Sequence, residues 1–504
     1  MANFVTVANL AKVGIAAILF SLVRIIYRVY FHPLSKIPGP KLAAASTAYI
    51  FYYNVIKGGV FIWHLERLHG IYGPIIRISP REVHIKDSSY YDDIYASSMR
   101  KREKDYPSIR SFEIDGASFS TISAEDHRER RAPFEKFFSK SAVAKMEHII
   151  QQRLDKLCGH LDRGYESYKV VNLGAGFAGM TADIIYQYTL GYDSGNLEKE
   201  GFNEHVRDGV NALFRGYHVT VFFPILQTIT RSLPLSVLKR MNPSAWVVTD
   251  QKLGVQARIV DFLAGKRTKD GSIMEKVADS RLSAHLRGPE RLADEAFSIL
   301  VGGTETTGRS LSLGFFKILS DRVVKEKMLQ ELRSLMPTPQ SRPTWNQLEQ
   351  LPYMSGVILE TLRLSTGIAN RSPRVAPTET LVYKGYSIPP GTPVSQTNYF
   401  VLMDPEIFPD PHAFDPERWV RAAAKGEPLQ RYLVNFSKGT RICLGMNLAY
   451  AELYLTLANL FRRYEFELYD TTEKDIAFAR DFAAPYPDEG NLQLRVMVTG
   501  LVEE

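Results

Sequence analysis

The ten residues from Phe436 to Gly445 constrain the fold of this 504-residue chain more than any other stretch. They contain Cys443, one of two cysteines, and directly precede an apolar-periodic run at 444–464 that predicts a helix. Cys443 would then lie at a helix start, where backbone N–H groups and the helix dipole favour a thiolate. Gly439 and Gly445 would let the backbone approach a flat, bulky ligand. Taken alone, a lone cysteine such as Cys443 is more typical of a buried, inert residue.

The pattern Phe436-x-x-Gly439-x-Arg441-x-Cys443-x-Gly445 resembles the haem-binding signature of the cytochrome P450 monooxygenases. The resemblance implies that Cys443 is the metal ligand, supplying the axial thiolate of the iron in haem b. It also implies that Phe436, Gly439, Arg441 and Gly445 belong to the cofactor-binding loop. Three further segments match the family in the expected order, so the resemblance covers nearly the whole chain.

The second matching segment, Gly302-Gly303-Thr304-Glu305-Thr306, lies within a predicted long helix at 293–320. Glycines inside a helix cost about 1 kcal/mol each relative to alanine, so Gly302 and Gly303 point to a ligand close to the backbone. Thr306 can hydrogen-bond to the Gly302 carbonyl or release it, which would open a groove for oxygen and water. By resemblance, Glu305 and Thr306 are the catalytic acid–alcohol pair that delivers protons. Without the cysteine motif, a kinked or tightly packed helix explains the segment better.

The third segment, Glu360-Thr361-Leu362-Arg363, places an acid and a base on one helix face at i, i+3 spacing. Taken alone, this pattern predicts a surface ion pair of small energetic value. In the family the motif forms a buried structural network with a later arginine, which Arg418 matches here. The resemblance therefore assigns Glu360, Arg363 and Arg418 a structural role and no catalytic one.

The fourth set of residues concerns the two propionate carboxylates of haem, which need cationic partners. Arginine is favoured because its planar fork matches a carboxylate. By resemblance, Arg441 and Arg374 bind the propionates, joined by His127 and Arg131, which stand four residues apart on one predicted helix face. Many relatives carry tryptophan at the position of His127. A solvated helix face is the alternative for the basic run at 127–131.

Composition excludes several classes of protein. With 45% hydrophobic and 23% charged residues and no biased tract, the chain is globular. Two cysteines cannot form a disulfide scaffold, and no Cys/His cluster has zinc-ligand spacing. The net charge of +7 is scattered, which argues against a nucleic-acid partner. Helical periodicity dominates, so we expect a mainly α fold with a minor β sheet, the cytochrome P450 fold by resemblance. The expected helices are 142–161, 293–320, 322–335, 353–364 and 444–464, and the expected strands are 75–79, 83–86 and a hairpin at 381–394 turning at Lys384-Gly385.

An apolar segment from Phe4 to Val23, with Lys12 as its only charge, is long enough to span a bilayer. Basic residues follow it, which by the positive-inside rule places the rest of the chain in the cytosol. We expect residues 1–30 to be a single-pass anchor in the endoplasmic reticulum membrane; an interfacial or buried first helix is the alternative. The proline-rich segment 31–41 predicts a rigid hinge that holds the body off the membrane. Residues 42–504 contain no linker or repeat and are expected to form one haem-binding catalytic domain.

The segments 30–40 and 126–134 are most similar to filamentous-fungal enzymes of secondary metabolism, such as trichodiene-oxygenase-like members. The resemblance implies hydroxylation or epoxidation of an apolar terpenoid or polyketide with dioxygen. Electrons would come from NADPH through a separate, membrane-bound cytochrome P450 reductase, since the chain has no flavin or nicotinamide motif; Lys438 is a candidate for docking it. The substrate pocket is expected to draw on residues 106–120, 210–224, 296–306 and 366–372, with an access channel lined by Phe214, Phe222 and Phe223.

Three other functions fit parts of the sequence. A reductase-independent haem-thiolate isomerase or dehydratase would share the fold but would have less need of Thr306. A non-catalytic haem- or lipid-binding membrane protein would share the motifs without turnover. A cysteine hydrolase would need a histidine base that no position in the sequence makes assignable. The four motifs together favour the monooxygenase.

Overall fold

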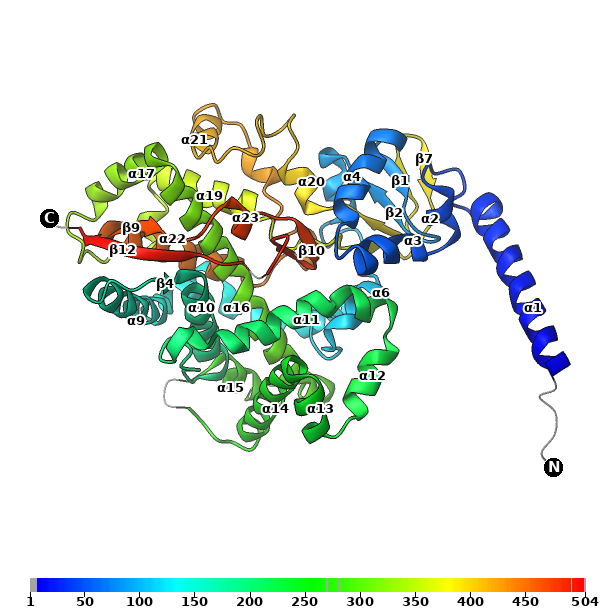
Figure 1. Ribbon diagram of the computed structural model, residues 1–504, viewed down its shortest axis with the longest axis horizontal. Coiled ribbons are helices and arrows are strands. Elements are labelled where there is room, and N and C mark those ends of the chain that lie inside the picture. Colours follow the sequence, from blue (N-terminus) through cyan, green and yellow to red (C-terminus); the bar gives the residue numbers. More distant parts are fainter. Residues whose placement is uncertain (1–6, 269–270, 280–281, 491, 503–504) are drawn as a thin grey trace.

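A computed structural model describes residues 7–268, 271–279, 282–490 and 492–502 of the chain. The fold is mainly helical with a minor sheet, as the periodicity predicts. The long helix α16 (Pro289–Ser320) runs through the middle of the body and is largely buried (Figure 1). Helices α10 (Leu173–Leu190), α19 (Pro352–Ser365) and α22 (Met446–Arg463) pack against it. Residues of this central helix would therefore line any cavity inside the core.

Glycines bring α16 close to α10. A Cβ on Gly303 would lie 2.8 Å from the Cγ1 atom of Ile185, and one on Gly308 would lie 3.2 Å from the backbone of Ala178. A Cβ on Gly302, by contrast, would meet nothing within 4 Å. Two of the three glycines thus serve helix packing, and Gly302 alone of the three leaves open space beside the helix.

The predicted helices at 322–335 and 353–364 correspond to α17 (Arg322–Leu335) and α19. The prediction of one helix at 142–161 is wrong, because Met146 (φ −94°, ψ 5°) separates α8 (Lys140–Lys145) from α9 (Glu147–Glu166). Met146 is buried and continues the apolar periodicity, so the pattern does not reveal the break. Further helices are α2 (Lys41–Ala45), α3 (Ala48–Phe51), α4 (Phe61–Tyr72), α5 (Tyr91–Ile94), α6 (Tyr106–Ile109), α7 (Ala124–Glu135), α11 (Glu204–Phe222), α12 (Ile225–Ser232), α13 (Leu235–Met241), α14 (Pro243–Leu263), α15 (Ile273–Ala278), α18 (Trp345–Leu348), α20 (Asn398–Leu402), α21 (Glu417–Ala424) and α23 (Glu473–Ile476).

The largest sheet has five strands in the order β1-β2-β8-β5-β3, with β2 and β8 parallel and the other pairs antiparallel. Its strands are β1 (Ile75–Arg77), β2 (Val83–Ile85), β3 (Glu103–Lys104), β5 (Arg374–Val375) and β8 (Pro393–Ser395). A second sheet has three strands in the order β4 (Val171–Asn172), β12 (Arg495–Leu501) and β9 (Tyr464–Leu468). A separate pair is formed by β10 (Arg480–Phe482) and β11 (Ala484–Tyr486).

The predicted hairpin at 381–394 is too long. Strands β6 (Leu381–Tyr383) and β7 (Tyr386–Ile388) form the hairpin and turn at Lys384-Gly385, as expected. Val394 instead lies in β8, where it pairs with residues of β2 and β5 in the large sheet. Two prolines after β7 redirect the chain from the hairpin into this sheet.

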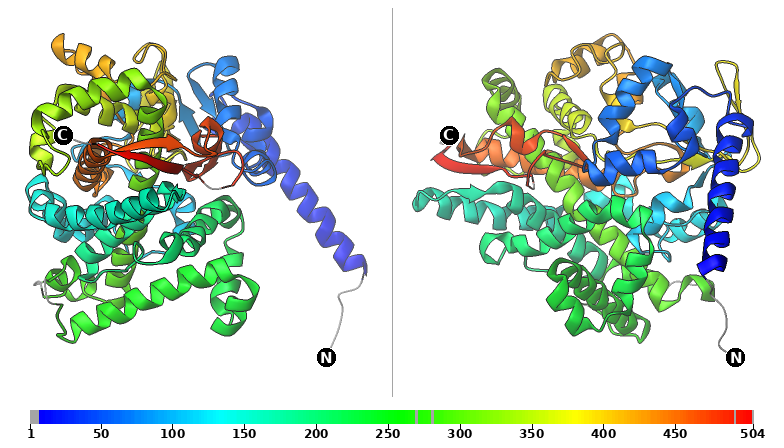
Figure 2. Two further views of the ribbon diagram at one scale, coloured as in Figure 1. Left: turned by 60° about the vertical axis from the view of Figure 1, so that its left-hand side comes forward. Right: turned by 45° about the vertical axis from the view of Figure 1, so that its right-hand side comes forward.

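The N-terminal helix α1 (Val7–Ile26) projects from the body, as Figure 1 and the left-hand view of Figure 2 show. Together with a π-helical turn at Tyr27–Phe31 it provides a span, Lys12–Phe31, that is apolar and long enough to cross a membrane and is not buried in the body. Phe4, where the predicted segment begins, lies outside the described residues. The segment 31–41 does not stand free as a spacer, because Leu34 and Ile37 are buried against the sheet and the Pro38 carbonyl accepts a hydrogen bond from Arg77.

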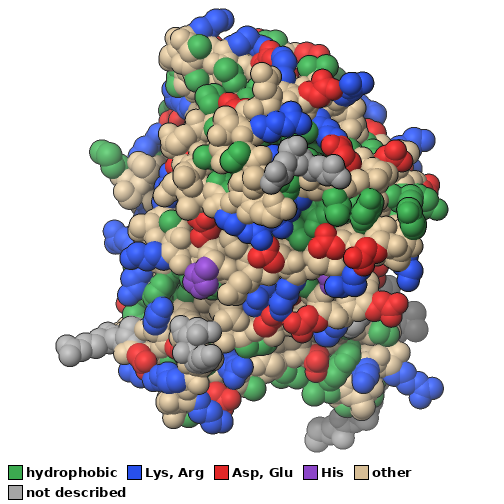
Figure 3. Space-filling model, turned by 90° about the vertical axis from the view of Figure 1, so that its left-hand side faces the viewer, with side chains coloured by type: hydrophobic (Ala, Val, Ile, Leu, Met, Phe, Trp, Pro, Cys, Tyr) green, Lys and Arg blue, Asp and Glu red, His purple; other side chains and the backbone are tan. Residues whose placement is uncertain are grey.

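The surface of the body carries charges of both signs. On the face shown in Figure 3, acidic and basic side chains are interspersed and neither gathers into a continuous stripe. Such a mixed surface is typical of soluble protein bodies. The basic residues behind the net charge of +7 are therefore not concentrated in a stripe on this face.

Candidate active site

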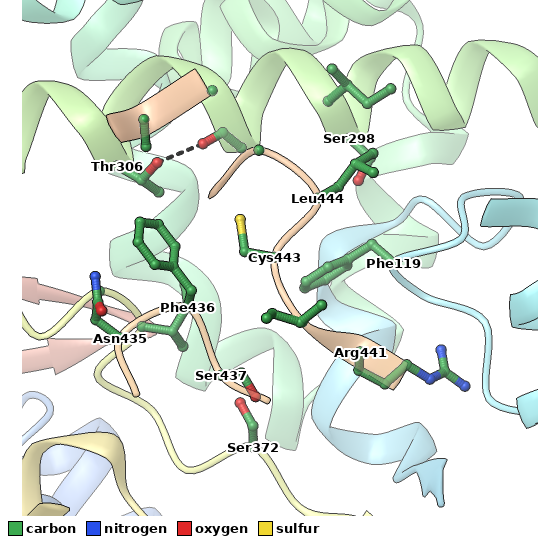
Figure 4. A pocket seen from close by; sticks show the side chains of 18 of the residues that line it. Phe119, Ser298, Thr306, Ser372, Asn435, Phe436, Ser437, Arg441, Cys443 and Leu444 are labelled. Carbon is green, nitrogen blue, oxygen red and sulfur yellow. Dashed lines mark hydrogen bonds between the residues drawn. The ribbon is translucent and has the colours of Figure 1, made fainter. Parts of the chain in front are cut away.

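The loop before α22 presents Cys443 to an internal cavity of about 340 Å³. Its sulfur points across the cavity toward α16, where Thr306 lies on the far side (Figure 4). The Cys443 N–H donates to the Phe436 carbonyl at 3.0 Å, so the loop folds back on itself. Burial raises the pKa of the Cys443 thiol, while the N–H of Gly445 and the charge of Arg131 oppose this shift. The helix start therefore does not hold a thiolate unaided, and a metal would have to stabilise it.

The two glycines of the loop have different functions. Gly439 has φ +69°, and a Cβ there would lie 2.1 Å from the carbonyl oxygen of Ala96. Gly445 has φ −85°, lines the cavity, and would meet nothing within 4 Å if it carried a Cβ. Gly439 is thus required for the path of the loop, whereas Gly445 leaves space for a ligand.

On the opposite wall, the Thr306 hydroxyl donates to the Gly302 carbonyl at 2.7 Å, the bond drawn as a dashed line in Figure 4. Gly302, Gly303 and Thr306 all line the cavity. A threonine that bonds to the carbonyl one turn earlier competes with the helix ladder, so this bond is easily exchanged. The arrangement places a hydroxyl that can hold or pass a proton in front of the sulfur.

Basic side chains gather at one end of the cavity, where Lys104, His127, Arg131, Arg374 and Arg441 line it. Burial, reinforced by the neighbouring arginines, lowers the pKa of Arg441 to about 9 and that of His127 to about 2. Burial and the same arginines also lower the pKa of Lys104. The arginine charges repel one another and any further positive charge in this enclosed space, which disfavours the protonated forms of His127 and Lys104.

Of these five basic side chains, only one forms an ion pair with a described residue, Arg131 with the exposed Glu135 at 2.8 Å. Among the described residues, no carboxylate lies within ion-pair distance of Lys104, Arg374 or Arg441. Glu295 also lines the cavity, but it is bound by Arg291 at 3.0 Å. A ligand with two carboxylates would complete this end of the cavity, and haem has two propionates.

The protein ligand that the site offers to a metal, a single cysteine, also fits haem. Among the described residues, no group of three or more His, Cys, Asp or Glu side chains is placed so that it could hold a metal ion. An iron at Cys443 would thus have one protein thiolate and must bring its other donors with it, as a porphyrin does. The open face of Gly445 next to the sulfur leaves room for a flat ring.

A family model described as Cytochrome P450 matches residues 47–488. The chain belongs to the cytochrome P450 family. Over 485 residues it is 41% identical to "Cytochrome P450 monooxygenase aflU" of Aspergillus parasiticus, covering 95% of this chain and 96% of that one. It is 40% identical to "Conidiogenone synthase PchP450" of Penicillium rubens, covering 94% and 96%. It is 37% identical to "Cytochrome P450 monooxygenase pbrB" of Penicillium brasilianum, covering 96% of each chain. The protein is therefore a cytochrome P450 monooxygenase, and its family implies a haem-thiolate centre.

One predicted catalytic residue of this P450 points elsewhere. Glu305 does not line the cavity; its buried carboxylate lies 3.3 Å from Arg207 and 3.1 Å from Arg309. The reason is helical phase, because successive residues of an α-helix point about 100° apart. Thr306 and Gly302, four residues apart, share the cavity face, while Glu305 turns toward α11. The expected acid–alcohol pair is thus not assembled, and Glu305 instead ties α11 to α16.

The predicted structural network of the P450 is fully buried. Arg363 binds both carboxylate oxygens of Glu360, at 2.9 and 2.7 Å, and Arg418 binds the same carboxylate at 3.1 Å. The Trp419 ring N–H adds a bond at 2.9 Å. Arg363 also donates to the carbonyl oxygens of Leu402, Pro411 and Ala413. The single carboxylate of Glu360 is shared by two guanidinium groups, and Arg418 donates its remaining N–H groups to the carbonyl oxygens of Pro409 and Asp410. The network joins α19 to the chain that leads to the cysteine loop.

Three of the four predicted segments line the cavity, whereas the fourth contributes a single residue. The segments 106–120, 296–306 and 366–372 each contribute several residues, and Phe119 and Phe436 flank the sulfur in Figure 4. From 210–224 only Tyr217 lines the cavity; the predicted channel aromatics do not. Phe222 and Phe223 pack edge-on against Phe51 instead. Lining residues that the sequence analysis missed include Lys104, Phe138, Ile185, Glu295, Asn398, Asn435, Leu448, Glu452 and Ala483.

A signal for some of the missed residues exists in the sequence. Glu295 stands eleven residues before Thr306, which at about 100° per residue is within about 20° of the same helix face. The helical pattern around Thr306 thus predicts Glu295 as a lining residue. Lys104 has no comparable signal, because β3 reaches the cavity through its pairing with Arg374 and Val375, far along the chain.

Proposed function

We propose that this P450 is a membrane-anchored haem-thiolate monooxygenase that hydroxylates or epoxidises an apolar terpenoid or polyketide in fungal secondary metabolism. The observation that carries the proposal is the placement of Cys443 and Thr306 on facing walls of one mostly apolar cavity. The same cavity has an unbalanced cationic end that suits the propionates of haem b. When bound, haem supplies the iron at which dioxygen is activated.

The side chains around the cavity would divide the remaining tasks. Cys443 would hold the iron through its sulfur, and Arg374, Arg441 and Arg131 would orient the cofactor through its carboxylates. Thr306 would hold a proton at its Oγ1 atom and exchange its bond to the Gly302 carbonyl for one to a ligand. Apolar walls would exclude water, which limits the loss of reducing equivalents.

Glu305 keeps a place in the proposal, but as a positioning residue. Its ion pairs with Arg207 and Arg309 fix the part of α16 that carries Thr306. Direct proton delivery from its carboxylate would require these two pairs to break. We therefore assign proton handling at the cavity to Thr306 and to water beside Gly302.

Electrons would come from NADPH through a separate cytochrome P450 reductase. Lys438, the docking residue suggested by the sequence, is held at 2.7 Å by Asp92 and is only 24% exposed, so it is not free to bind an acidic partner. Other basic side chains would have to make that contact. Turnover with the reductase should still weaken as salt rises, since such encounters are electrostatic.

The N-terminal helix supports placement at the endoplasmic reticulum membrane with the body in the cytosol. Its apolar side chains are exposed along the span, for example Phe20 at 67%. Basic side chains lie near the C-terminal end of the span, at Arg24 and Arg28, which the positive-inside rule places on the cytosolic side. The burial of Leu34 and Ile37 would hold the body close to the bilayer instead of at the end of a spacer.

The proposal is tested by the absorption spectrum of the purified, reduced protein with carbon monoxide. A strongly red-shifted Soret band that is lost in Cys443→Ala is expected, because the axial thiolate sets its position. Turnover of terpenoid and polyketide candidates should then require both NADPH and reductase. A protein that binds no haem would overturn the proposal, and turnover without NADPH would favour an isomerase or dehydratase.

A further inference from the structure

Away from its cationic end, the cavity has a polar wall built from Asn370 and Arg371, between α19 and β5. The Nε atom of Arg371 donates to Glu82 at 2.8 Å, and its guanidinium lies 5.3 Å from the centre of the Phe61 ring. Among the described residues, neither terminal nitrogen of Arg371 has a hydrogen-bond partner. Its side chain is 16% exposed although it lies deep in the protein, because it faces the cavity.

Asn370, the preceding residue, also lines the cavity and has an acceptor without a partner among the described residues. Its Nδ2 atom donates to the Tyr217 hydroxyl at 2.7 Å, and that hydroxyl donates to the Ser108 carbonyl at 2.9 Å. Because the single proton of Tyr217 goes to Ser108, the tyrosine oxygen must accept from Asn370, which fixes the orientation of the amide. The Oδ1 atom of Asn370 is buried and has no partner. An unpaired buried acceptor of this kind is costly unless a ligand or water satisfies it.

The charge of Arg371 is already balanced. Burial acts to lower the pKa of Arg371, but the carboxylate of Glu82 outweighs it and raises that pKa. Glu82 itself is held by a hydroxyl bond from Ser395 at 2.9 Å. A carboxylate added here would place a second negative charge near Glu82, whereas a neutral oxygen needs only the free N–H groups.

We propose that Asn370 and Arg371 bind a neutral oxygen group of the substrate, such as a hydroxyl or a hydroxy-ketone. The terminal N–H groups of Arg371 donate to that oxygen, and the Oδ1 atom of Asn370 accepts from a hydroxyl. This inference rests on the proposed monooxygenase function and narrows its substrate class. The substrate is an apolar scaffold that already carries an oxygen, so an earlier oxygenation or an oxygen-retaining cyclisation must supply it.

The test uses three matched probes that share an imidazole, which ligates haem iron and shifts its Soret band. They are 1-alkylimidazoles with chains of eight to twelve carbons, ending in a methyl, a hydroxyl or a carboxylate group. Dissociation constants are taken from titrations of the purified holoprotein, so no turnover is needed. At the best chain length, the hydroxyl probe should bind about tenfold more tightly than the methyl probe, or about 1.4 kcal/mol, and the carboxylate probe more weakly than the hydroxyl probe.

Two variants test the assignment of residues. Asn370→Leu removes the acceptor at similar volume, and Arg371→Lys keeps the charge beside Glu82 while removing the fork. In both, the preference for the hydroxyl probe should fall below threefold. Ser298→Ala, which changes a polar lining residue of α16, should leave the preference unchanged and is the matched control.

The possible failures are distinct. If no probe shifts the Soret band, the iron is not accessible, and the proposed function fails together with this inference. If the band shifts but the three probes bind equally, the proposed function stands and the polar anchor is refuted. If the carboxylate probe binds most tightly, the wall recognises an anion and the neutral-oxygen assignment is wrong.

Discussion

Replacing Gly439 by alanine should damage the cysteine loop more than its backbone conformation alone explains. A non-glycine residue at φ +69° costs about 1–2 kcal/mol. The new methyl group would also lie 2.1 Å from the Ala96 carbonyl oxygen, so the loop must move by about 1 Å to reach an ordinary contact. Overpacking of this kind adds about 1–3 kcal/mol, giving a total of about 2–5 kcal/mol. The same shift displaces Cys443, so haem content should fall with stability.

Gly426 provides the matched control for this prediction. It has the same φ of +69°, but a Cβ there would meet nothing within 4 Å. Gly426→Ala should therefore cost only the backbone part, about 1–2 kcal/mol, and leave haem content unchanged. Denaturant unfolding measures the first effect, and the haem-to-protein absorbance ratio measures the second. Equal losses in the two variants, with haem retained in both, would refute the role of the Ala96 contact.

Four further outcomes are expected. Thr306→Ala should release more peroxide per NADPH consumed, measured with reductase, because the hydroxyl proton is lost from the cavity; unchanged coupling would exclude this role. Glu305→Gln should destabilise the protein by about 3–5 kcal/mol in denaturant titrations, because it leaves buried Arg207 without its counter-charge. Burial lowers the pKa of His69 to about 4, against about 6.5 in the unfolded chain, so the folded state favours the neutral imidazole. The contribution of His69 to the free energy of unfolding is therefore full above pH 6.5 and is lost as the pH falls toward 4. The unfolding midpoint of wild type should therefore drop over this window more than that of His69→Gln. Deleting residues 1–31 should move the protein from the membrane to the soluble fraction, and full retention would reveal a second membrane contact.

Sequence reasoning succeeds at this site where the chemistry is local. The cysteine loop is ten residues long, and its glycines and its helix start are encoded side by side in the chain. The Glu360–Arg363 pair is likewise one helix turn apart, so its geometry follows from the sequence once burial is assumed. Burial itself does not follow, because it depends on the carbonyl oxygens at 402, 411 and 413, which come from a separate segment.

Sequence reasoning fails where a role depends on direction or on distant partners. The resemblance pairs Glu305 with Thr306, yet adjacent residues of an α-helix point about 100° apart. Phe222 and Phe223 are aromatic residues of the kind that line an apolar channel. In the structure, however, both pack against Phe51, which comes from a segment far earlier in the chain. No local pattern distinguishes these two outcomes for an exposed aromatic residue.

The charges around the cavity explain how cofactor and substrate would be kept apart. At one end, Lys104, Arg374 and Arg441 have no acidic partner among the described residues, so a dicarboxylate that enters relieves their repulsion and stabilises the fold by linkage. On the polar wall, Arg371 already has Glu82, so it offers hydrogen bonds without net attraction for an anion. A propionate is therefore drawn to the first group and not to the second. This difference would leave Arg371 available for a neutral oxygen of the substrate, so that separate sets of contacts would orient the cofactor and the substrate.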